Sequence, residues 1–285
     1  MSGQRSITGS TSQATSKTGK MPRILSVANQ KGGVGKTTTA VNLSTALAAV
    51  GKKVLLVDLD PQGNASTGFG IRRASLHAST YDVLFGEADI LDVAQETKVP
   101  RLSVAPSSVH LSGAEIELVT EERREFRLQD ALRRPMPYDY VIIDCPPSLN
   151  LLTLNALVCT DSVVVPLQCE FFALEGLSQL TKTIERVRKA YNPDLSIHGV
   201  LLTMFDRRNN LSRMVAGDVR DYFGDVVYDT VIPRNVRVSE APSHGLPAIV
   251  YDMNCPGAKA YIHLAREILK REKVMLAAET PRDAA

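Results

Sequence analysis

Tryptophan is absent from this sequence of 285 residues, and only 5% of its residues are aromatic. That scarcity argues against a protein that binds single-stranded nucleic acid by stacking bases on aromatic rings. Long apolar runs are missing as well: the longest, around 141–143 and 163–167, fall far short of the roughly 20 residues that a membrane-spanning helix needs. The amino terminus has no apolar stretch typical of a signal peptide. We therefore expect a cytoplasmic protein with no membrane partner.

Charge and cysteine spacing exclude further classes of protein. The 33 basic and 31 acidic residues give a net charge of +2, so nucleic-acid binding would require a local basic patch. None of the four cysteines forms a C-x-x-C pair, which argues against a zinc ribbon or a dithiol redox site. Free cysteines of this kind suit a reducing compartment.

The first 22 residues differ in composition from the rest of the chain. They are rich in Ser, Thr, Gly and Gln and nearly free of large apolar side chains, so burial cannot offset the entropy lost on ordering. We predict a disordered tail over 1–22, a single folded domain over 23–278 and a short flexible tail over 279–285.

Apolar runs alternate with helical patterns along the folded part. The runs that predict buried strands are 24–29, 54–59, 102–106, 140–145, 162–167, 197–204 and 226–232. The patterns that predict helices are 38–50, 114–134, 149–160, 174–191, 212–223 and 258–277. This alternation predicts an α/β domain whose mostly parallel, twisted sheet carries helices on both faces. Ligands of such sheets bind at the carboxyl ends of the strands.

A glycine-rich turn follows the first predicted strand. It reads Asn29-Gln30-Lys31-Gly32-Gly33-Val34-Gly35-Lys36-Thr37-Thr38. Its glycines allow backbone N–H groups to turn inward around phosphate oxygens, and the helix that starts there adds a partial positive charge. Lys36 can reach the β- and γ-phosphates of a nucleotide, and Thr37 offers a hydroxyl to Mg²⁺. We expect residues 31–38 to bind ATP with Mg²⁺ in a P-loop NTPase domain.

This turn departs from the usual phosphate-loop pattern, because Gln30 replaces its first glycine and Lys31 is added. The variant resembles the deviant Walker A motif, KGGxGK[ST], of the ParA/MinD family of P-loop ATPases. The resemblance implies that Lys31 reaches across a nucleotide sandwich dimer to the phosphates of the partner subunit, with Gly32 near the seam. Lys31 would then neutralise charge on the transferring phosphoryl group as an arginine finger does. Hydrolysis would require a homodimer.

Two acidic motifs extend the resemblance. Residues 54–64 look like the second ATPase motif of the family, in which Asp60 corresponds to the aspartate that orients the attacking water and lies near the metal. Asp58 and Asp60 could instead only cap the following turn. Residues 138–148 look like the family's Walker B strand, and Asp144 at its end would hold Mg²⁺, through a water molecule because this ion keeps much of its hydration.

Two further stretches, 166–176 and 231–243, look closest to chromosomal ParA/Soj partitioning proteins. The resemblance implies that Pro233 and Asn235 lie near the adenine and the ribose; a buried structural turn is the alternative for this segment. It also implies that the ATP-bound dimer binds double-stranded DNA without sequence preference.

Basic residues that match the motifs for DNA binding are Arg208 and Arg237, and Arg207 and Arg213 are weaker candidates. Arginine suits phosphate because its guanidinium group is planar and always charged. Each of these arginines could also be an ordinary solvated surface residue.

The resemblance therefore implies a Mg²⁺-dependent ATPase that partitions chromosomes and associates with the nucleoid. Its hydrolysis would be weak until a ParB-like centromere-binding protein stimulates it and releases the dimer from DNA. An alternative is an ATPase of the same fold that positions another cargo, such as flagella, chemoreceptor arrays or microcompartments. A metabolic P-loop enzyme acting on a small molecule is a more remote alternative.

A membrane-bound branch of the family ends in a lipid-binding amphipathic helix. In the last predicted helix, Tyr261, Leu264, Ile268 and Leu269 instead form a stripe that predicts packing on the core. No bulky apolar residue follows 276, so we expect no lipid anchor.

Overall fold

Seven strands form one sheet in the computed structural model, which describes residues 19–279. The strands are β1 (Arg23–Val27), β2 (Val54–Asp58), β3 (Gln95–Glu96), β4 (Leu102–Ala105), β5 (Tyr140–Asp144), β6 (Ser162–Gln168) and β7 (Ser196–Thr203). Their order across the sheet is β3-β4-β2-β5-β1-β6-β7. Neighbouring strands are parallel except the short β3, which pairs antiparallel with β4.

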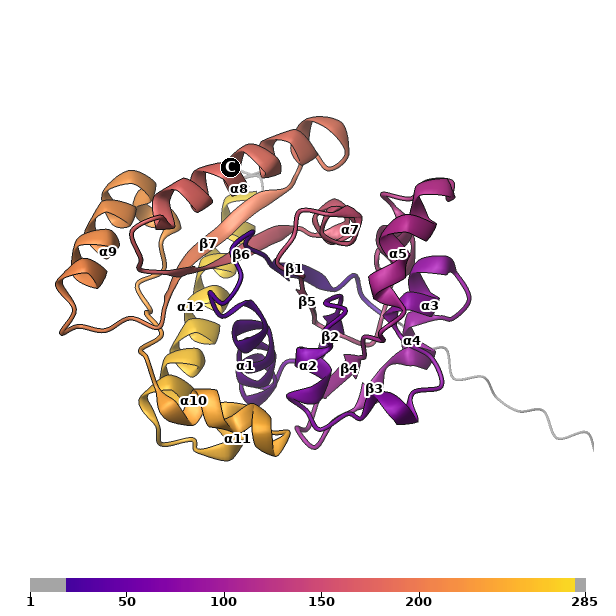
Figure 1. The fold of residues 1–285 in the computed structure, drawn as a ribbon, viewed down its shortest axis with the longest axis horizontal. Coiled ribbons are helices and arrows are strands. Elements are labelled where there is room, and N and C mark those ends of the chain that lie inside the picture. Colours follow the sequence, from indigo (N-terminus) through magenta and orange to yellow (C-terminus); the bar gives the residue numbers. More distant parts are fainter. Residues whose placement is uncertain (1–18, 280–285) are drawn as a thin grey trace, which may run out of the picture.

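Helices cover both faces of this sheet. They are α1 (Lys36–Ala49), α2 (Asn64–Thr67), α3 (Thr80–Phe85), α4 (Ile90–Val93), α5 (Leu111–Glu117), α6 (Arg127–Leu132), α7 (Leu151–Cys159), α8 (Ala173–Ala190), α9 (Asn210–Phe223), α10 (Val236–Glu240), α11 (Ala248–Tyr251) and α12 (Pro256–Glu279). Figure 1 shows α1 and α12 on one side of the sheet and α7 and α8 on the other. The predicted α/β fold is confirmed.

Alternating side chains of the strands fill two apolar cores. Leu25 and Leu56 pack in one core with residues of α1 and α12, while Ile24 and Leu55 pack in the other with residues of α7 and α8. All four are fully buried. Because both faces are covered, the strands read as continuous apolar runs in the sequence.

The predicted strand at 226–232 is wrong. This segment forms one isolated bridge with β7, between Val200 and Val227, and the N–H groups of Tyr228 and Ile232 donate to β7 carbonyls at 3.0 and 2.8 Å. The backbone N–H groups of Asp229 and Thr230 donate to the Glu267 carboxylate of α12, at 2.9 and 3.0 Å. The Glu267 side chain, which is distant in the sequence, therefore binds two N–H groups that a continuous strand would donate to its neighbouring strand.

The predicted helix at 114–134 is also wrong as one element. It divides into α5, a short 3-10 turn over Leu118–Thr120 and α6. Arg123 interrupts it with a φ of 53°, a left-handed conformation that a continuous α-helix does not contain. Helices α3 and α4 and strand β3 lie where no element was predicted.

The described residues at the start of the chain differ from the predicted amino-terminal tail. Lys20 falls inside the predicted disordered segment, yet its carbonyl accepts from the Met136 N–H at 3.0 Å and its ammonium lies 2.5 Å from Asp139. The described chain therefore already makes tertiary contacts before residue 23. Residues 1–18 and 280–285 lie outside the described residues, and the remaining domain boundaries stay a prediction.

The last helix packs as its sequence pattern predicts. Tyr261, Leu264 and Ile268 are buried against the core that includes α1. Within residues 19–279, no helix has the length and apolar character needed to cross a membrane.

Gly199 of β7 is a position where the fold leaves no room for a side chain. A Cβ atom there would lie 2.5 Å from the ring of Tyr228, which is fully buried and hydrogen-bonded to His198 at 2.7 Å. We expect Gly199→Ala to lower the free energy of unfolding by about 2–3 kcal/mol, because the ring must move within a packed core. Urea denaturation measures this.

Gly217→Ala on α9 is the matched control, because no atom lies within 4 Å of its added methyl group. There the better helix propensity of alanine should leave stability unchanged or raise it by up to about 1 kcal/mol. Equal stability of the two variants would contradict the packing argument at Gly199.

Candidate nucleotide site

The predicted site residues meet at the carboxyl edge of the central strands. In the sheet register, Asp144 at the end of β5 lies beside Val27 of β1 and Asp58 of β2. The glycine-rich turn follows β1 directly, and α1 begins at Lys36. Three segments far apart in the sequence therefore share one edge of the sheet.

The glycine-rich turn has the backbone of an anion cradle. Gly33 and Gly35 have φ of 75° and 89°, left-handed values that glycine adopts without strain. Nothing lies within 4 Å of the place where a Cβ of Gly32 or Gly33 would stand. Gly35 caps α1 without a side-chain hydrogen bond, so the first N–H groups of this helix are available to a phosphate.

The two lysines of the turn have different partners. Lys36 is only 7% exposed, and its Nζ donates to the Lys31 carbonyl at 2.8 Å. Burial lowers the pKa of Lys36, and the nearby charge of Asp144 opposes that change. The Nζ of Lys31 lies 2.5 Å from Oε2 of Glu170, just beyond β6. In the single chain, therefore, Lys31 is held by its own subunit.

Asp144 is a buried carboxylate whose charge has no hydrogen-bond donor. Its side chain is fully buried, and neither oxygen accepts a hydrogen bond from any described residue. Burial, and then the charge of Asp58, raise the pKa of Asp144 well above its usual range, although the nearby Thr37 hydroxyl and Lys36 ammonium oppose this rise. A buried carboxylate without donors is costly unless a cation compensates it.

This orphaned carboxylate fits a bound Mg²⁺. Thr37 stands at the start of α1 next to the cradle. Among residues 19–279, no cluster of three acidic, histidine or cysteine side chains could hold a metal alone. Nucleotide oxygens and water would therefore complete the coordination, as is usual for this ion.

Asp58 and Asp60, of which the sequence analysis gives only Asp60 a functional role, differ sharply in the structure. Asp58 accepts hydrogen bonds from the N–H and hydroxyl of Ser66, at 2.8 and 2.6 Å, and from the Asp60 N–H at 3.2 Å. Burial nonetheless raises the pKa of Asp58 to about 6. Asp58 therefore holds the turn after β2 in place.

Asp60 keeps a carboxylate oxygen for a ligand. Its Oδ1 accepts from the Gln62 N–H at 2.8 Å, its backbone carbonyl accepts from the Ser107 hydroxyl at 2.6 Å, and Oδ2 has no hydrogen-bond partner among residues 19–279. Sequence reasoning missed the supporting serines, Ser66 and Ser107. No sequence signal marks Ser107, which lies 47 residues beyond Asp60.

The segment with Pro233 and Asn235 lies beside the cradle. The Thr203 hydroxyl, at the end of β7, donates to the Val34 carbonyl at 2.8 Å. Two residues further on, Phe205 forms a bridge with Pro233. Asn235 caps α10, because its Oδ1 accepts from the Val238 N–H at 3.3 Å. This placement is compatible with the predicted base-binding role, which stays a prediction.

The structure separates the two arginines predicted to bind DNA. Arg208 is 91% exposed and pairs with Asp206 at 3.1 Å, whereas Arg237 pairs with Glu240 at 3.1 Å and with Asp252 at 3.8 Å. The charge of each arginine is thus partly balanced within the chain.

Arg208, but not Arg237, lines a basic cavity of about 720 Å³ between the end of β7 and the start of α12. Its other basic lining residues are Arg207, Arg234, Lys259 and His263. Asp206 is its single acidic lining residue. Lys259 and His263 were not predicted, because they come from α12, far along the chain.

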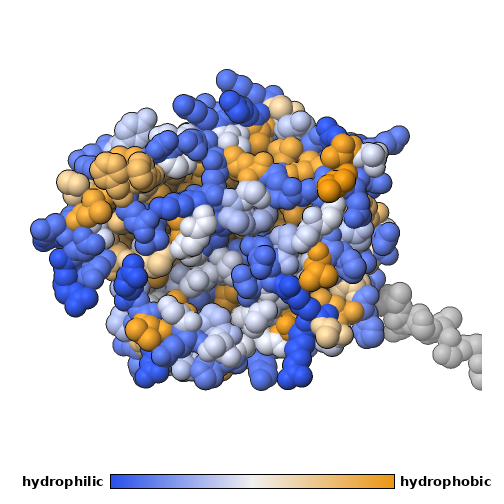
Figure 2. Space-filling view, in the orientation of Figure 1, coloured by the Kyte–Doolittle hydropathy of each residue, from blue (hydrophilic) through white to orange (hydrophobic). Residues whose placement is uncertain are grey.

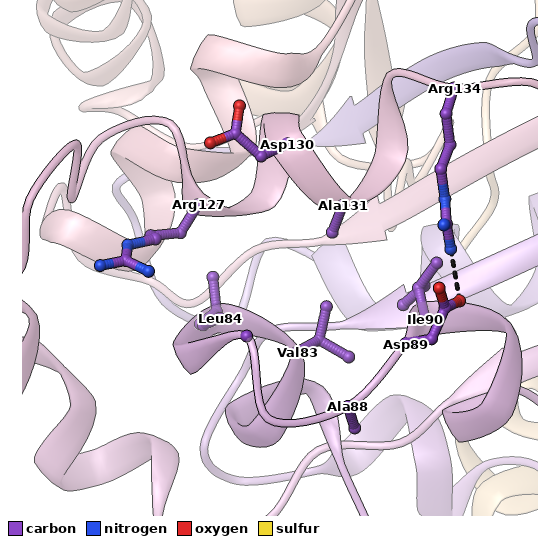
Figure 3. A pocket seen from close by; sticks show the side chains of 10 residues that line it. Val83, Leu84, Ala88, Asp89, Ile90, Arg127, Asp130, Ala131 and Arg134 are labelled. Atoms are coloured by element: carbon purple, nitrogen blue, oxygen red, sulfur yellow. Dashed lines mark hydrogen bonds and ion pairs between the residues drawn. The ribbon is translucent and has the colours of Figure 1, made fainter.

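Another cavity, of about 260 Å³, lies between α3 and α6 (Figure 3). Its Arg134 is ion-paired with Asp89, and its Arg127 with Glu121. No predicted site residue lines it, and it takes no part in the nucleotide site.

Comparison with known proteins agrees with this geometry. The family model of an AAA domain matches residues 22–197. The chain is 63% identical over 254 residues to the chromosome partitioning protein ParA of Caulobacter vibrioides, which covers 88% of this chain and 95% of that protein. It is 57% identical over 249 residues to the sporulation initiation inhibitor protein Soj of Bacillus subtilis, covering 87% and 98%.

Solved structures show the same fold. The cobyrinic acid a,c-diamide synthase of Mycobacterium smegmatis, solved with bound ADP and magnesium, has a TM-score of 0.78 and 39% identity over 89% of this chain and 96% of that one. The cell division ATPase MinD of Pyrococcus furiosus has a TM-score of 0.73 and 30% identity over 88% and 99%. Through its deviant phosphate loop and its identity with these partitioning proteins, the chain belongs to the ParA/Soj family of P-loop ATPases.

Proposed function

We propose that this chain is a chromosome-partitioning ATPase that hydrolyses ATP as a sandwich dimer and binds DNA in that state. The observation that carries the ATPase proposal is the phosphate cradle beside Asp144, a fully buried carboxylate without a donor. The 63% identity with a ParA protein supports the partitioning role. Identity with the diamide synthase is lower, at 39%, which favours partitioning over a metabolic reaction.

Each residue at the site has a distinct task in this proposal. Lys36 and the N–H groups of the cradle hold the phosphates, while Thr37 and Asp144 hold Mg²⁺. The bound ion supplies positive charge that withdraws electrons from the phosphate oxygens. Asp60 orients the attacking water with its free Oδ2, a positioning task that suits a loose transition state.

Dimerisation requires Lys31 to change its partner. In the single chain its ammonium is held by Glu170 at 2.5 Å, and both side chains are about half exposed. An exposed ion pair contributes little to stability, so the phosphates of a partner subunit can replace Glu170. Lys31 would then stabilise the charge that develops on the transferring phosphoryl group.

The basic cavity beside Arg208 supports DNA binding. Its lining carries four arginine or lysine side chains against one aspartate, which favours contact with phosphates. Such contacts read no sequence, and two copies in a dimer double their number. DNA affinity would therefore depend on ATP and fall steeply with salt. A ParB-like partner would stimulate hydrolysis and release the dimer, giving a nucleoid-associated protein.

Binding to a random-sequence duplex tests this proposal. We expect tight binding with ATP and weak binding with ADP or no nucleotide. Arg208→Ala should weaken the ATP-dependent binding about tenfold and make its salt dependence shallower, because phosphate contacts are lost from both subunits. Fluorescence anisotropy across a salt series measures both effects.

Arg123→Ala is the matched control, because Arg123 is also exposed and ion-paired, with Asp130 at 3.0 Å, but lies outside the basic cavity. Its binding should equal that of the wild type. Absence of ATP-dependent binding at low salt would remove DNA from the proposal while keeping the ATPase. The protein would then be an ATPase that positions another cargo.

A further inference from the structure

Gly257 stands in the first turn of α12, directly against α10. A Cβ atom at this position would lie 2.3 Å from Cγ2 of Val238 and 3.4 Å from Cβ of Asn235. Glycine is the poorest helix former after proline, so its place in a long helix needs a reason. The contact with Val238 supplies one, because α12 could not start so close to α10 with any larger residue.

Val238 cannot make room for a Cβ atom at position 257 by rotating its side chain. It is only 9% exposed and packs in the core beneath α1 and α12. Valine is branched at Cβ and has essentially one favourable rotamer in a helix. An added methyl group at 257 must therefore push α10 itself.

Moving Val238 would also move Asn235. The Val238 N–H donates to Asn235 Oδ1 at 3.3 Å, and this bond directs the amide oxygen toward the helix. The Asn235 NH₂ group faces the other way and has no hydrogen-bond partner among residues 19–279. It is therefore a donor that this segment can offer to a ligand.

From these contacts we propose that Gly257 is a positioning residue for recognition of the nucleoside. This rests on the proposed ATPase function and on the predicted place of Asn235 near the base and ribose of the bound nucleotide. Gly257 sets how closely α12 approaches α10, α10 sets the direction of the Asn235 amide, and the amide contacts the nucleoside. The phosphate cradle is built on other elements, the end of β1 and the start of α1.

Binding of two ligands to Gly257→Ala tests the proposal. The affinity for ATP with Mg²⁺ should fall about tenfold, the effect of one misplaced hydrogen bond. The affinity for inorganic tripolyphosphate with Mg²⁺ should stay at the wild-type value, because that ligand has no nucleoside. In the double variant Gly257→Ala/Val238→Ala the clashing methyl group is gone, so ATP affinity should recover. Isothermal titration calorimetry measures the two affinities of Gly257→Ala and the ATP affinity of the double variant.

Gly217→Ala, whose added methyl meets no atom within 4 Å, is the control and should bind both ligands normally. Three results would each overturn the proposal: wild-type ATP affinity in Gly257→Ala, an equal loss for both ligands, or no recovery in the double variant. If Gly257→Ala fails to fold, failure of the double variant to restore folding also overturns it. A wild-type protein that binds no ATP would overturn the proposed function as well, whereas an effect missing only in the variants overturns this inference alone.

Discussion

Replacing Lys31 by alanine is expected to lower the maximal rate of ATP hydrolysis at least about a thousandfold, the effect of removing a charge supplied in trans. ATP binding by the single chain should change little, because the Lys31 ammonium is paired with Glu170 there. Steady-state phosphate release and nucleotide titration measure the two effects separately. An equal loss of binding and hydrolysis would show that Lys31 acts within its own subunit.

Mixing two inactive variants tests whether Lys31 crosses between subunits. Asp60→Ala lacks the residue that orients water but keeps Lys31, whereas Lys31→Ala keeps Asp60. In a mixed dimer, the Lys31→Ala subunit would receive Lys31 from its partner and have one complete site. Hydrolysis should therefore return on mixing. A mixture as inactive as its components would contradict the crossing lysine.

Replacing Asp144 by asparagine is expected to have opposite effects on activity and stability. Hydrolysis should fall at least about a hundredfold, because the ligand of Mg²⁺ and its charge are lost. Without nucleotide, the free energy of unfolding should rise by about 1–3 kcal/mol, because a buried charge without a donor is removed. Phosphate release and chemical denaturation measure the two quantities.

The stability gain from Asp144→Asn should also depend on pH. Folding raises the pKa of Asp144, so the native chain binds its proton more tightly than the unfolded chain does. Stability of the wild type is therefore lost as pH rises above the ordinary aspartate value of about 4. The advantage of the asparagine variant should be larger at pH 8 than at pH 5. A gain that is constant with pH would contradict this account.

Asp58→Asn is the matched control, since Asp58 is the neighbour of Asp144 in the sheet register. Asp58 already accepts three hydrogen bonds, and asparagine, with one acceptor oxygen, cannot keep all of them. This variant should lose stability where Asp144→Asn gains it. A gain in both would mean that burial alone, and not the missing donor, decides the effect.

Residues close together in the sequence made the nucleotide site predictable. The cradle over 31–38 is one continuous turn whose glycines need left-handed angles, and Gly33 and Gly35 have them. Apolar runs that include Asp58 and Asp144 predicted two strands, and the structure pairs these strands with each other. Local backbone geometry and burial of whole strands decide these features, and both leave a direct pattern in the sequence.

Features that depend on distant partners were not predictable. The segment 226–232 has the composition of a strand, but Glu267 of α12 accepts from the N–H groups of Asp229 and Thr230. The helical pattern at 114–134 did not indicate that the backbone of Arg123 adopts a left-handed conformation. Likewise, the basic cavity joins Arg208 to Lys259 and His263 only because α12 packs beside the end of β7.

By itself, then, the sequence determined that this chain is an α/β P-loop ATPase and which turn holds the phosphates, because those properties reside in short contiguous segments. Only the tertiary structure decided which carboxylate is free to act. Asp58 and Asp144 both end buried strands, yet Ser66 hydrogen-bonds to the first, whereas the second forms no hydrogen bond with a described residue. Whether a buried carboxylate is hydrogen-bonded depends on which donors the folded chain places beside it. The pattern of apolar residues along a strand does not contain this information.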